Sequence, residues 1–275
     1  MKKIFFLLLT VSVFASCSKN NPTDEEHPQN KNCKTLSFVQ LLGEGTQGSY
    51  DEWISTFYYD SQNRVSKIEK KYKNTIKFGR FIYEGNTIKY SEDGLDVIYT
   101  LNNKGLIINT LRKNPYNTNE PQVNYSYNSS NQLALITSED DNYFYGPIKI
   151  TRELIYENGN LVKIMGKTSL LHEPKTLIGT FTETFTFTKF NAPLYNSAYL
   201  ELFENASSVD DSENLLYSLG YFGITSKNMV KSMTPPINNT DNKTRYYDSK
   251  ADQNGNVIEV IPNSSDIYKY NYQCE

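Results

Sequence analysis

Histidine and cysteine are scarce in this chain, which has two histidines and three cysteines among its 275 residues. Histidine is the side chain best suited to proton transfer near neutral pH, and Ser or Cys nucleophiles need a basic partner of this kind. His27 lies in a polar stretch, and His172 lies in a turn-like Leu-Leu-His-Glu-Pro sequence. The sequence therefore indicates no catalytic residue, no metal site and no cofactor.

Basic residues are not in excess, and long apolar runs are rare. Lys and Arg number 28 against 31 Asp and Glu, for a formal net charge of −3. An acidic chain without a basic stripe argues against nucleic acid, or an anionic membrane surface, as a partner. Beyond the first 14 residues no segment is long and apolar enough to cross a bilayer as a helix, so we expect membrane attachment through a covalent anchor.

The N-terminus has the layout of a signal peptide. Two lysines precede an apolar run at residues 4–14, and the small pair Ala15-Ser16 precedes Cys17. A cysteine in this place is typical of a bacterial lipobox, which is cleaved before the cysteine and acylated on it. We predict a signal peptide at residues 1–16, lipidation of Cys17 and a location in the bacterial cell envelope, on the outer membrane. The alternative is an ordinary secretory signal that contains a cysteine.

The remaining chain divides into a tether and one domain. Residues 17–32 combine the lipidated cysteine with a polar stretch that has no large apolar side chain, which predicts a flexible tether. Residues 33–275 are predicted to form a single β-rich domain, with Cys33 at its start and Cys274 next to its end. In an oxidising envelope these two cysteines are candidates for a disulfide that joins the ends of the domain. The alternative is two buried free thiols.

Alanine is rare, with six residues, whereas the chain has 22 tyrosines and 31 asparagines. Tyrosine favours half-buried strands and asparagine favours turns. A unit of an aromatic strand, a polar turn with Asn or Gly and a second strand recurs along the chain, which predicts antiparallel hairpins. The units lie at 58–68, 83–88, 99–106, 127–136 and 156–164, with a degenerate one at 185–194 and a seventh at 246–257.

Four pairs of branched residues just after these turns are three positions apart, and such residues point to opposite faces of a regular strand. The polar residues between them favour a β-bulge that returns both to one face. The pairs are Val65/Ile68, Leu133/Ile136, Leu161/Ile164 and Val257/Val260.

The fold predicted from these patterns is mainly β. Residues 34–195 and 240–275 should form one antiparallel meander, curved or closed into a partial barrel, with a short helical insertion near 196–220 on the concave face. The apolar stripe expected to cover that face comprises Leu200, Leu202, Phe203, Leu215, Leu216 and Leu219.

The hairpin units resemble the YD (Rhs-type) repeat, in which an aromatic residue and Tyr-Asp precede a polar turn, Leu and Ile. The dipeptide is intact at Tyr59-Asp60 and Tyr247-Asp248, and Glu, Asn or Thr replaces the Asp elsewhere. Together with the lipobox, the mature chain resembles an uncharacterised Bacteroidetes-type lipoprotein family with YD-like strands. This resemblance implies a fold and an envelope location, and it brings no catalytic residue with it.

Two other motifs match known sites poorly. Residues 43–48 read Gly-Glu-Gly-Thr-Gln-Gly, but the β-rich segment that follows lacks the helix that a dinucleotide site needs. Residues 139–142 read Glu-Asp-Asp-Asn without the alternating spacing of a calcium loop, and we interpret them as a solvated loop.

The sequence favours a non-catalytic binding or interaction module on the cell surface. A row of tyrosines on a solvated sheet face suits a glycan, a peptide or an envelope protein as partner, whereas tyrosine can also serve to cover a thin sheet. The competing hypothesis is a carboxylate-dependent envelope hydrolase, for example one that acts on glycans.

Overall fold

The computed structural model describes residues 33–43, 50–113, 122–142, 144–191, 211–235, 243–253, 256–262 and 267–274. The signal peptide, Cys17, the tether and His27 lie outside these ranges. The described residues form sixteen strands and one helix, α1 (Asp211–Ser218). The strands are β1 (Cys33–Gly43), β2 (Tyr50–Tyr59), β3 (Val65–Tyr72), β4 (Thr75–Glu84), β5 (Thr87–Glu92), β6 (Leu95–Leu101), β7 (Ile107–Lys113), β8 (Gln122–Tyr127), β9 (Leu133–Asn142), β10 (Gly146–Glu157), β11 (Asn160–Leu170), β12 (Leu177–Asn191), β13 (Asn228–Thr234), β14 (Arg245–Ala251), β15 (Val257–Pro262) and β16 (Ile267–Cys274).

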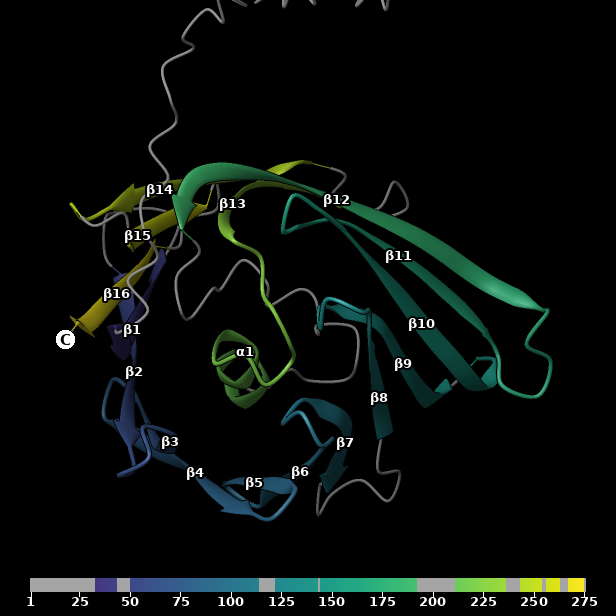
Figure 1. Ribbon diagram of the computed structural model, residues 1–275, viewed down its shortest axis with the longest axis horizontal. Coiled ribbons are helices and arrows are strands. Elements are labelled where there is room, and N and C mark those ends of the chain that lie inside the picture. Colours follow the sequence, from purple (N-terminus) through teal and green to yellow (C-terminus); the bar gives the residue numbers. More distant parts are fainter. Residues whose placement is uncertain are drawn as a thin grey trace, which may run out of the picture.

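The strands form a closed antiparallel barrel in which each strand pairs with its neighbours in the sequence (Figure 1). The prediction of a mainly antiparallel β fold is confirmed, but a curved sheet or partial barrel understates the closure. The first and last strands pair along eight positions, from Cys33 opposite Cys274 to Leu41 opposite Ile267. This pairing satisfies the two edges that an open sheet would leave exposed.

Three of the longer hairpin turns at one end of the barrel, β2–β3, β6–β7 and β8–β9, repeat a single hydrogen-bonding pattern. The Asp60 carboxylate accepts bonds from the backbone N–H groups of Gln62 and Arg64, at 2.8 and 2.9 Å. Asn102 and Asn128 accept the equivalent pairs of bonds in their own turns. The turn needs a side-chain oxygen at this place, which explains why Asn can replace the Asp of the YD pattern. We call this end of the barrel the Asp60 end and the opposite end the Trp53 end.

The predicted bulges are confirmed. The ladder register shifts by one residue just after the turn in all four hairpins, and also where β7 begins at Ile107. Both members of each pair face the core as a result, and none exceeds 5% exposure. A β-bulge repeated in successive hairpins thus keeps their branched residues on the inner face of the barrel.

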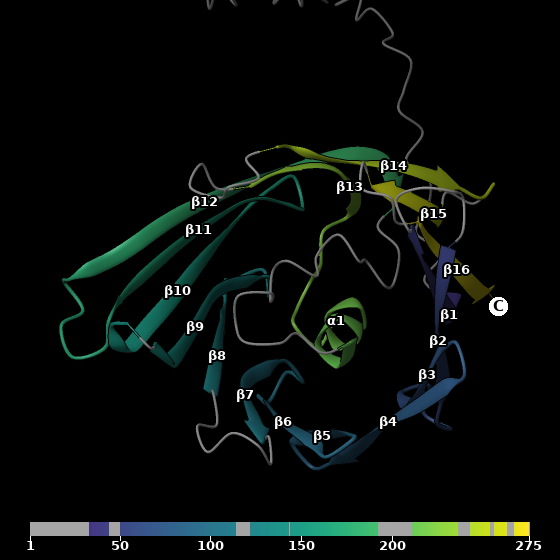
Figure 2. The ribbon, with the colours of Figure 1, turned by 180° about the vertical axis from the view of Figure 1, so that it is seen from behind.

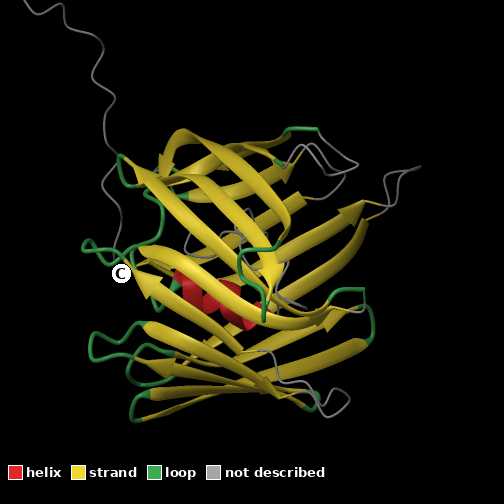
Figure 3. Ribbon diagram, turned by 90° about the vertical axis from the view of Figure 1, so that its right-hand side faces the viewer, coloured by secondary structure: helices red, strands yellow, loops and turns green. Residues whose placement is uncertain are grey.

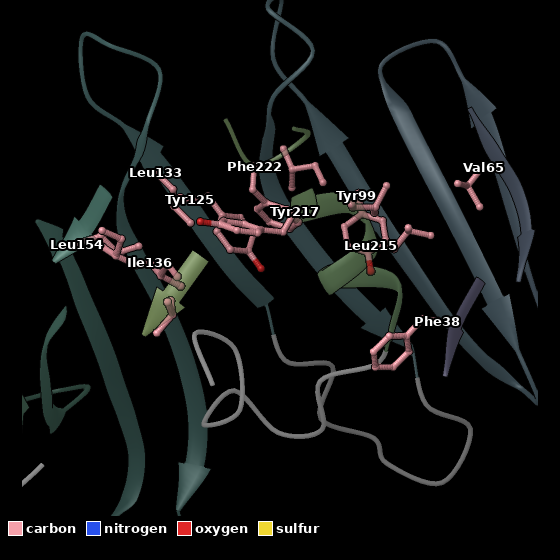
Figure 4. Packing of buried hydrophobic residues seen from close by; sticks show 14 of the residues in the cluster. Phe38, Val65, Tyr99, Tyr125, Leu133, Ile136, Leu154, Leu215, Tyr217 and Phe222 are labelled. Atoms are coloured by element: carbon pink, nitrogen blue, oxygen red, sulfur yellow. The ribbon is translucent and has the colours of Figure 1, made fainter. Parts of the chain in front are cut away.

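Helix α1 lies inside the ring of strands, as views from the front and from behind both show (Figures 1 and 2). Leu215 and Leu216 are buried, and Phe222, just after the helix, packs edge-on against Tyr125 of β8 at 4.9 Å (Figure 4). A buried ion pair of 2.7 Å joins Glu213 of the helix to Arg112 of β7. Seen from the side, the helix lies in the interior of the barrel, behind the strands that form its wall (Figure 3).

The segment after α1 closes the Asp60 end of the barrel. Gly223 forms a β-bridge with Gln132, and the Tyr221 carbonyl accepts a bond of 2.8 Å from the N–H of Ile107. The Lys227 N–H donates to the Gly159 carbonyl at 3.1 Å. This segment therefore links the turns of several hairpins across the barrel end.

The predicted helical cover is confirmed for Leu215, Leu216 and the partly buried Leu219. Its other members, Leu200, Leu202 and Phe203, lie outside the described residues. Within the described part of the chain, no helix is long and apolar enough to span a membrane.

Local details of the predicted hairpins need correction, and one strand was not predicted. The sixth unit has no turn between Phe187 and Asn191, because β12 continues to Asn191 and pairs with β13; its last residues, 192–194, lie outside the described ranges. The turn of the last hairpin is built around Asp252, which accepts a bond from the N–H of Asn256 at 2.9 Å, whereas Asp248 of the intact Tyr-Asp dipeptide lies within β14. Strand β13 was not predicted, because its buried residues come in adjacent pairs and do not alternate.

Candidate binding site

Aromatic side chains gather on the inner wall at the Trp53 end. The ladder places Tyr268, Gln40, Trp53 and Tyr72 side by side on four adjacent strands, β16, β1, β2 and β3. Strand alternation from the buried core residues Phe57 and Ile68 puts Trp53 and Tyr72 on the inner face. Trp53 is the single tryptophan of the chain and is 39% exposed.

Trp53 and Tyr72 form a stacked pair with a charged flank. Their ring centroids are 4.4 Å apart with an interplanar angle of 22°. The Tyr72 hydroxyl donates to Asp51 at 2.8 Å, and the Lys73 ammonium lies 2.7 Å from the same carboxylate. The bonds from Lys73 and Tyr72 hold the pKa of Asp51 below its ordinary value. The site thus presents an aromatic face next to a fixed anion and a cation.

A second polar group lies on the inner wall of the neighbouring strands. Glu92 of β5 pairs with Lys70 of β3 at 2.7 Å, and both side chains are largely buried. The Tyr90 hydroxyl donates to the same carboxylate. A Cβ on Gly79 would lie 2.3 Å from the Tyr90 hydroxyl oxygen, so a glycine at this position leaves room for the Tyr90 ring. These contacts hold Lys70 and Glu92 in place beside the row.

The other side of the row rests on a second aromatic group. Phe38 of β1 stacks on Tyr268 at 5.7 Å and packs at 5.5 Å against Tyr270, which is buried. Tyr270 stacks in turn on Tyr272 at 6.4 Å. The aromatic row therefore continues, on the β16 side, into the buried core of the barrel.

Many of the other tyrosines have a structural role. The Tyr83 hydroxyl donates to the Val65 carbonyl at 2.9 Å, and Tyr272 donates to the Val257 carbonyl at 2.8 Å. Tyr127 donates in the same way to the Ile107 carbonyl. Each acceptor is the first residue of a strand whose ladder a bulge interrupts. This recurring bond gives three of the 22 tyrosines a structural role, which differs from the sheet-covering role considered from the sequence.

The candidate residues drawn from the sequence have mixed outcomes. Cys33 and Cys274 lie opposite each other on β1 and β16, as expected for adjacent strands. His172 is exposed between β11 and β12. The glycine motif connects β1 directly to its antiparallel partner β2, so no dinucleotide helix follows it. Residues 139–142 belong to β9 and do not form a loop.

Among the described residues, no three His, Cys, Asp or Glu side chains form a group that could hold a metal ion. The group of residues around Trp53 was not predicted as a site from the sequence. Its usable signal was local: the only tryptophan alternates with Asp51 on a strand that begins beside a glycine-rich loop.

No protein-family model and no curated protein matches the chain. A porin-like protein from Bacteroides uniformis ATCC 8492 is similar in structure, with a TM-score of 0.63 and 14% identity over 87% of this chain and 98% of that one. A porin-like protein from Bacteroides vulgatus ATCC 8482 covers the same shares with a TM-score of 0.56 and 14% identity.

At these identities the likeness shows a shared fold alone. Both porin-like proteins come from Bacteroides species, which agrees loosely with the resemblance to Bacteroidetes proteins. Membership of the lipoprotein family is not shown. A Tc holotoxin pore from Photorhabdus luminescens has a TM-score of 0.37 over 11% of its chain, which carries no argument here.

Proposed function

We propose that this protein is a lipid-anchored, non-catalytic binding module of the bacterial envelope, and that it holds a saccharide at the Trp53 end of its barrel. The stack of the exposed Trp53 on the half-buried Tyr72 carries the proposal. Flat aromatic rings with a polar edge suit the C–H faces of a sugar ring, and Asp51 and Lys73 beside them can bond its hydroxyl groups. A peptide or an envelope protein is the alternative ligand.

The packing of the barrel supports a binding role in place of a pore. Helix α1 and the apolar side chains around it occupy the inside of the barrel (Figure 4). The outward positions of β3 are Lys67, Glu69 and Lys71, and those of β5 are Thr87, Lys89 and Ser91. Outward apolar residues on β4 therefore lie between polar strands, whereas a membrane-spanning barrel presents a continuous apolar band outward and polar side chains inward. We therefore propose that the barrel lies outside the bilayer and is held to it through Cys17, although its structural neighbours are described as porin-like.

The carboxylates at the site favour binding over hydrolysis. A glycosidase needs one carboxyl group with a raised pKa as its acid. The pKa of Asp51 is instead lowered by Lys73 and Tyr72, and Glu92 is bonded to Lys70 and Tyr90. Both groups therefore suit the recognition of a polar ligand.

Tryptophan fluorescence provides a direct test, because Trp53 is the sole tryptophan. Cello-, xylo-, malto- and chitooligosaccharides would be titrated into the mature chain carrying Cys17→Ser, after a glycan and peptide array has extended the set. We expect a saturable change in Trp53 emission with a saccharide. Tyr72→Ala should weaken binding at least tenfold, and the matched control Tyr246→Ala, an exposed aromatic residue on β14, should not.

Saturable binding of peptides, without saccharides, would contradict the ligand class. An array ligand whose affinity is unchanged by Tyr72→Ala and by Trp53→Ala would contradict the site. Circular dichroism of each variant checks that the barrel is folded.

A further inference from the structure

An apolar surface lies on the outside of the barrel at β2 and β4. Along β4, Ile76, Phe78 and Ile82 are 50%, 45% and 51% exposed, while Gly79 and Phe81, which point inward, are buried. Tyr58 of β2 is 41% exposed and shares this outer side, since its neighbour Phe57 is buried. We call Tyr58, Ile76, Phe78 and Ile82 the outer patch. Grouped apolar side chains on an exposed strand face usually mark an interaction surface.

Cations are interleaved with the outer patch. The ladder places Lys71 opposite Ile76 and Lys89 opposite Ile82. Lys67 lies opposite Tyr58, with its ammonium 3.8 Å from the centroid of the Tyr58 ring and 5.0 Å from that of Phe78. Long lysine stems beside aromatic and aliphatic groups are typical of surfaces that rest at a water–lipid boundary, where the ammonium reaches the headgroups.

Two acidic residues on this side, Glu69 and Glu84, are bonded to neighbouring side chains. Glu69 accepts a bond of 3.1 Å from the Tyr58 hydroxyl and lies 3.6 Å from Lys67, and Glu84 pairs with Lys89 at 2.6 Å. Arg80 and Lys71 lie on the same outer face and remain largely exposed. A chain that is acidic as a whole thus has a local surface on which cations accompany apolar groups, an arrangement that its sequence does not show as a stripe.

The start of the barrel lies close to this surface. The chain enters the barrel at Cys33 on β1, and β4 is the third strand from β1 around the ring. At about 4.8 Å per strand, this separation is about 14 Å. The fifteen residues 18–32, predicted from their sequence to be a tether, can extend to about 50 Å. A chain anchored at Cys17 could therefore bring the outer patch against the bilayer that holds the anchor.

We propose that the outer patch rests on the surface of this bilayer, with phospholipid headgroups and the upper acyl region as its partner. The proposal rests on the proposed lipid anchor at Cys17. The anchor would keep the outer patch at a high effective concentration near the bilayer, so that even a weak affinity of the patch for lipid would maintain the contact. Strand β4 would then face the membrane, and the barrel would lie on its side with the Trp53 end accessible from the aqueous phase.

The test uses the mature chain carrying Cys17→Ser, so that acylation plays no part, and vesicles of phosphatidylethanolamine and phosphatidylglycerol. We expect the chain to sediment with the vesicles as lipid is raised to millimolar concentration. The double variant Ile76→Ser/Phe78→Ser should lose at least fivefold in the bound fraction. The control Tyr246→Ser, which removes an exposed aromatic side chain from β14, should bind as the parent chain does.

Two results would overturn the proposal: no vesicle binding by the parent chain, or equal binding by the parent and the double variant. Neither depends on the saccharide site, which the fluorescence titration tests separately. The anchor has its own check, because a lipidated chain fractionates with membranes and Cys17→Ser should release it.

Discussion

Tyrosine side chains, and the Asp or Asn side chains of the turns, hydrogen-bond backbone groups of the turns and bulges at equivalent places around the barrel. Each bulge interrupts the ladder, and a tyrosine hydroxyl from the next strand bonds the carbonyl at its start in three hairpins. Each long turn at the Asp60 end needs a side-chain oxygen, as Asp60, Asn102 and Asn128 show. The YD pattern thus reflects the hydrogen bonds that backbone groups at turns and bulges require, and it does not identify a ligand.

Ionisation of the buried tyrosines is expected to destabilise the barrel at alkaline pH. Burial raises the pKa of Tyr59 to about 12, from about 10 in an unfolded chain. Because the folded pKa is the higher one, this contribution is complete below about pH 10 and is lost as the pH rises through 12. Tyrosinate absorbance and circular dichroism measured against pH would follow the two events together.

Tyr59→Phe provides the matched comparison. It removes the bond of 2.8 Å to the Thr35 carbonyl, so we expect a loss of about 1 kcal/mol near neutral pH and a weaker dependence on alkaline pH. The control Tyr246→Phe alters an exposed side chain and should change neither. An alkaline transition that is the same in Tyr59→Phe and in the parent would contradict the assignment.

At the scale of elements, α1 is joined to the wall by polar contacts as well as apolar ones. Glu213 pairs with Arg112 with side-chain exposures of 2% and 5%, and Ser212 lies 2.6 Å from the Tyr99 hydroxyl. A buried ion pair contributes little net stability, but it selects one position for the helix, because a displaced helix would leave both charges buried and unmatched.

Removal of one partner of this pair should therefore be costly. We expect Glu213→Leu to lower the free energy of unfolding by about 3–5 kcal/mol, and the double variant Arg112→Met/Glu213→Leu to recover most of that loss. Urea unfolding followed by circular dichroism measures both. Lys250→Met, which breaks the exposed pair with Glu259, should cost less than about 1 kcal/mol. Equal losses in the single and double buried variants would show that the pair does not position α1.

The elements that could be predicted from sequence are those whose causes are local. The hairpin of β2 and β3 follows from a turn around Asp60 and branched residues at Val65 and Ile68, all within a few positions. Strand β13 lacks the two-residue period, and the Trp53–Tyr72 stack depends on the pairing register of two strands. Such features arise from packing between distant residues, which a pattern along the chain does not record.

At the scale of the whole molecule, closure depends on one ladder. Every strand pair from β1–β2 to β15–β16 is consecutive in the sequence, whereas β1 and β16 are brought together from the two ends of the domain. Joining such distant strands has a high entropic cost in the unfolded chain. The seam between β1 and β16 is therefore the place where a covalent link would stabilise the barrel most.

Cys33 and Cys274 are placed to form that link, and we expect a disulfide between them. They are ladder partners at the end of the seam, and directly opposite residues of antiparallel strands have Cα atoms about 4.5–5.5 Å apart, which falls within disulfide geometry. Closing so long a loop is worth roughly 5 kcal/mol as an upper figure.

The oxidised chain carrying Cys17→Ser should therefore show no free thiol in denaturant and should unfold at lower urea concentration once reduced. Cys33→Ser and Cys274→Ser should each match the reduced chain and lose any response to reductant. Two titratable thiols in this chain, with an unfolding midpoint that reductant does not change, would show that hydrogen bonds and packing alone hold β1 against β16.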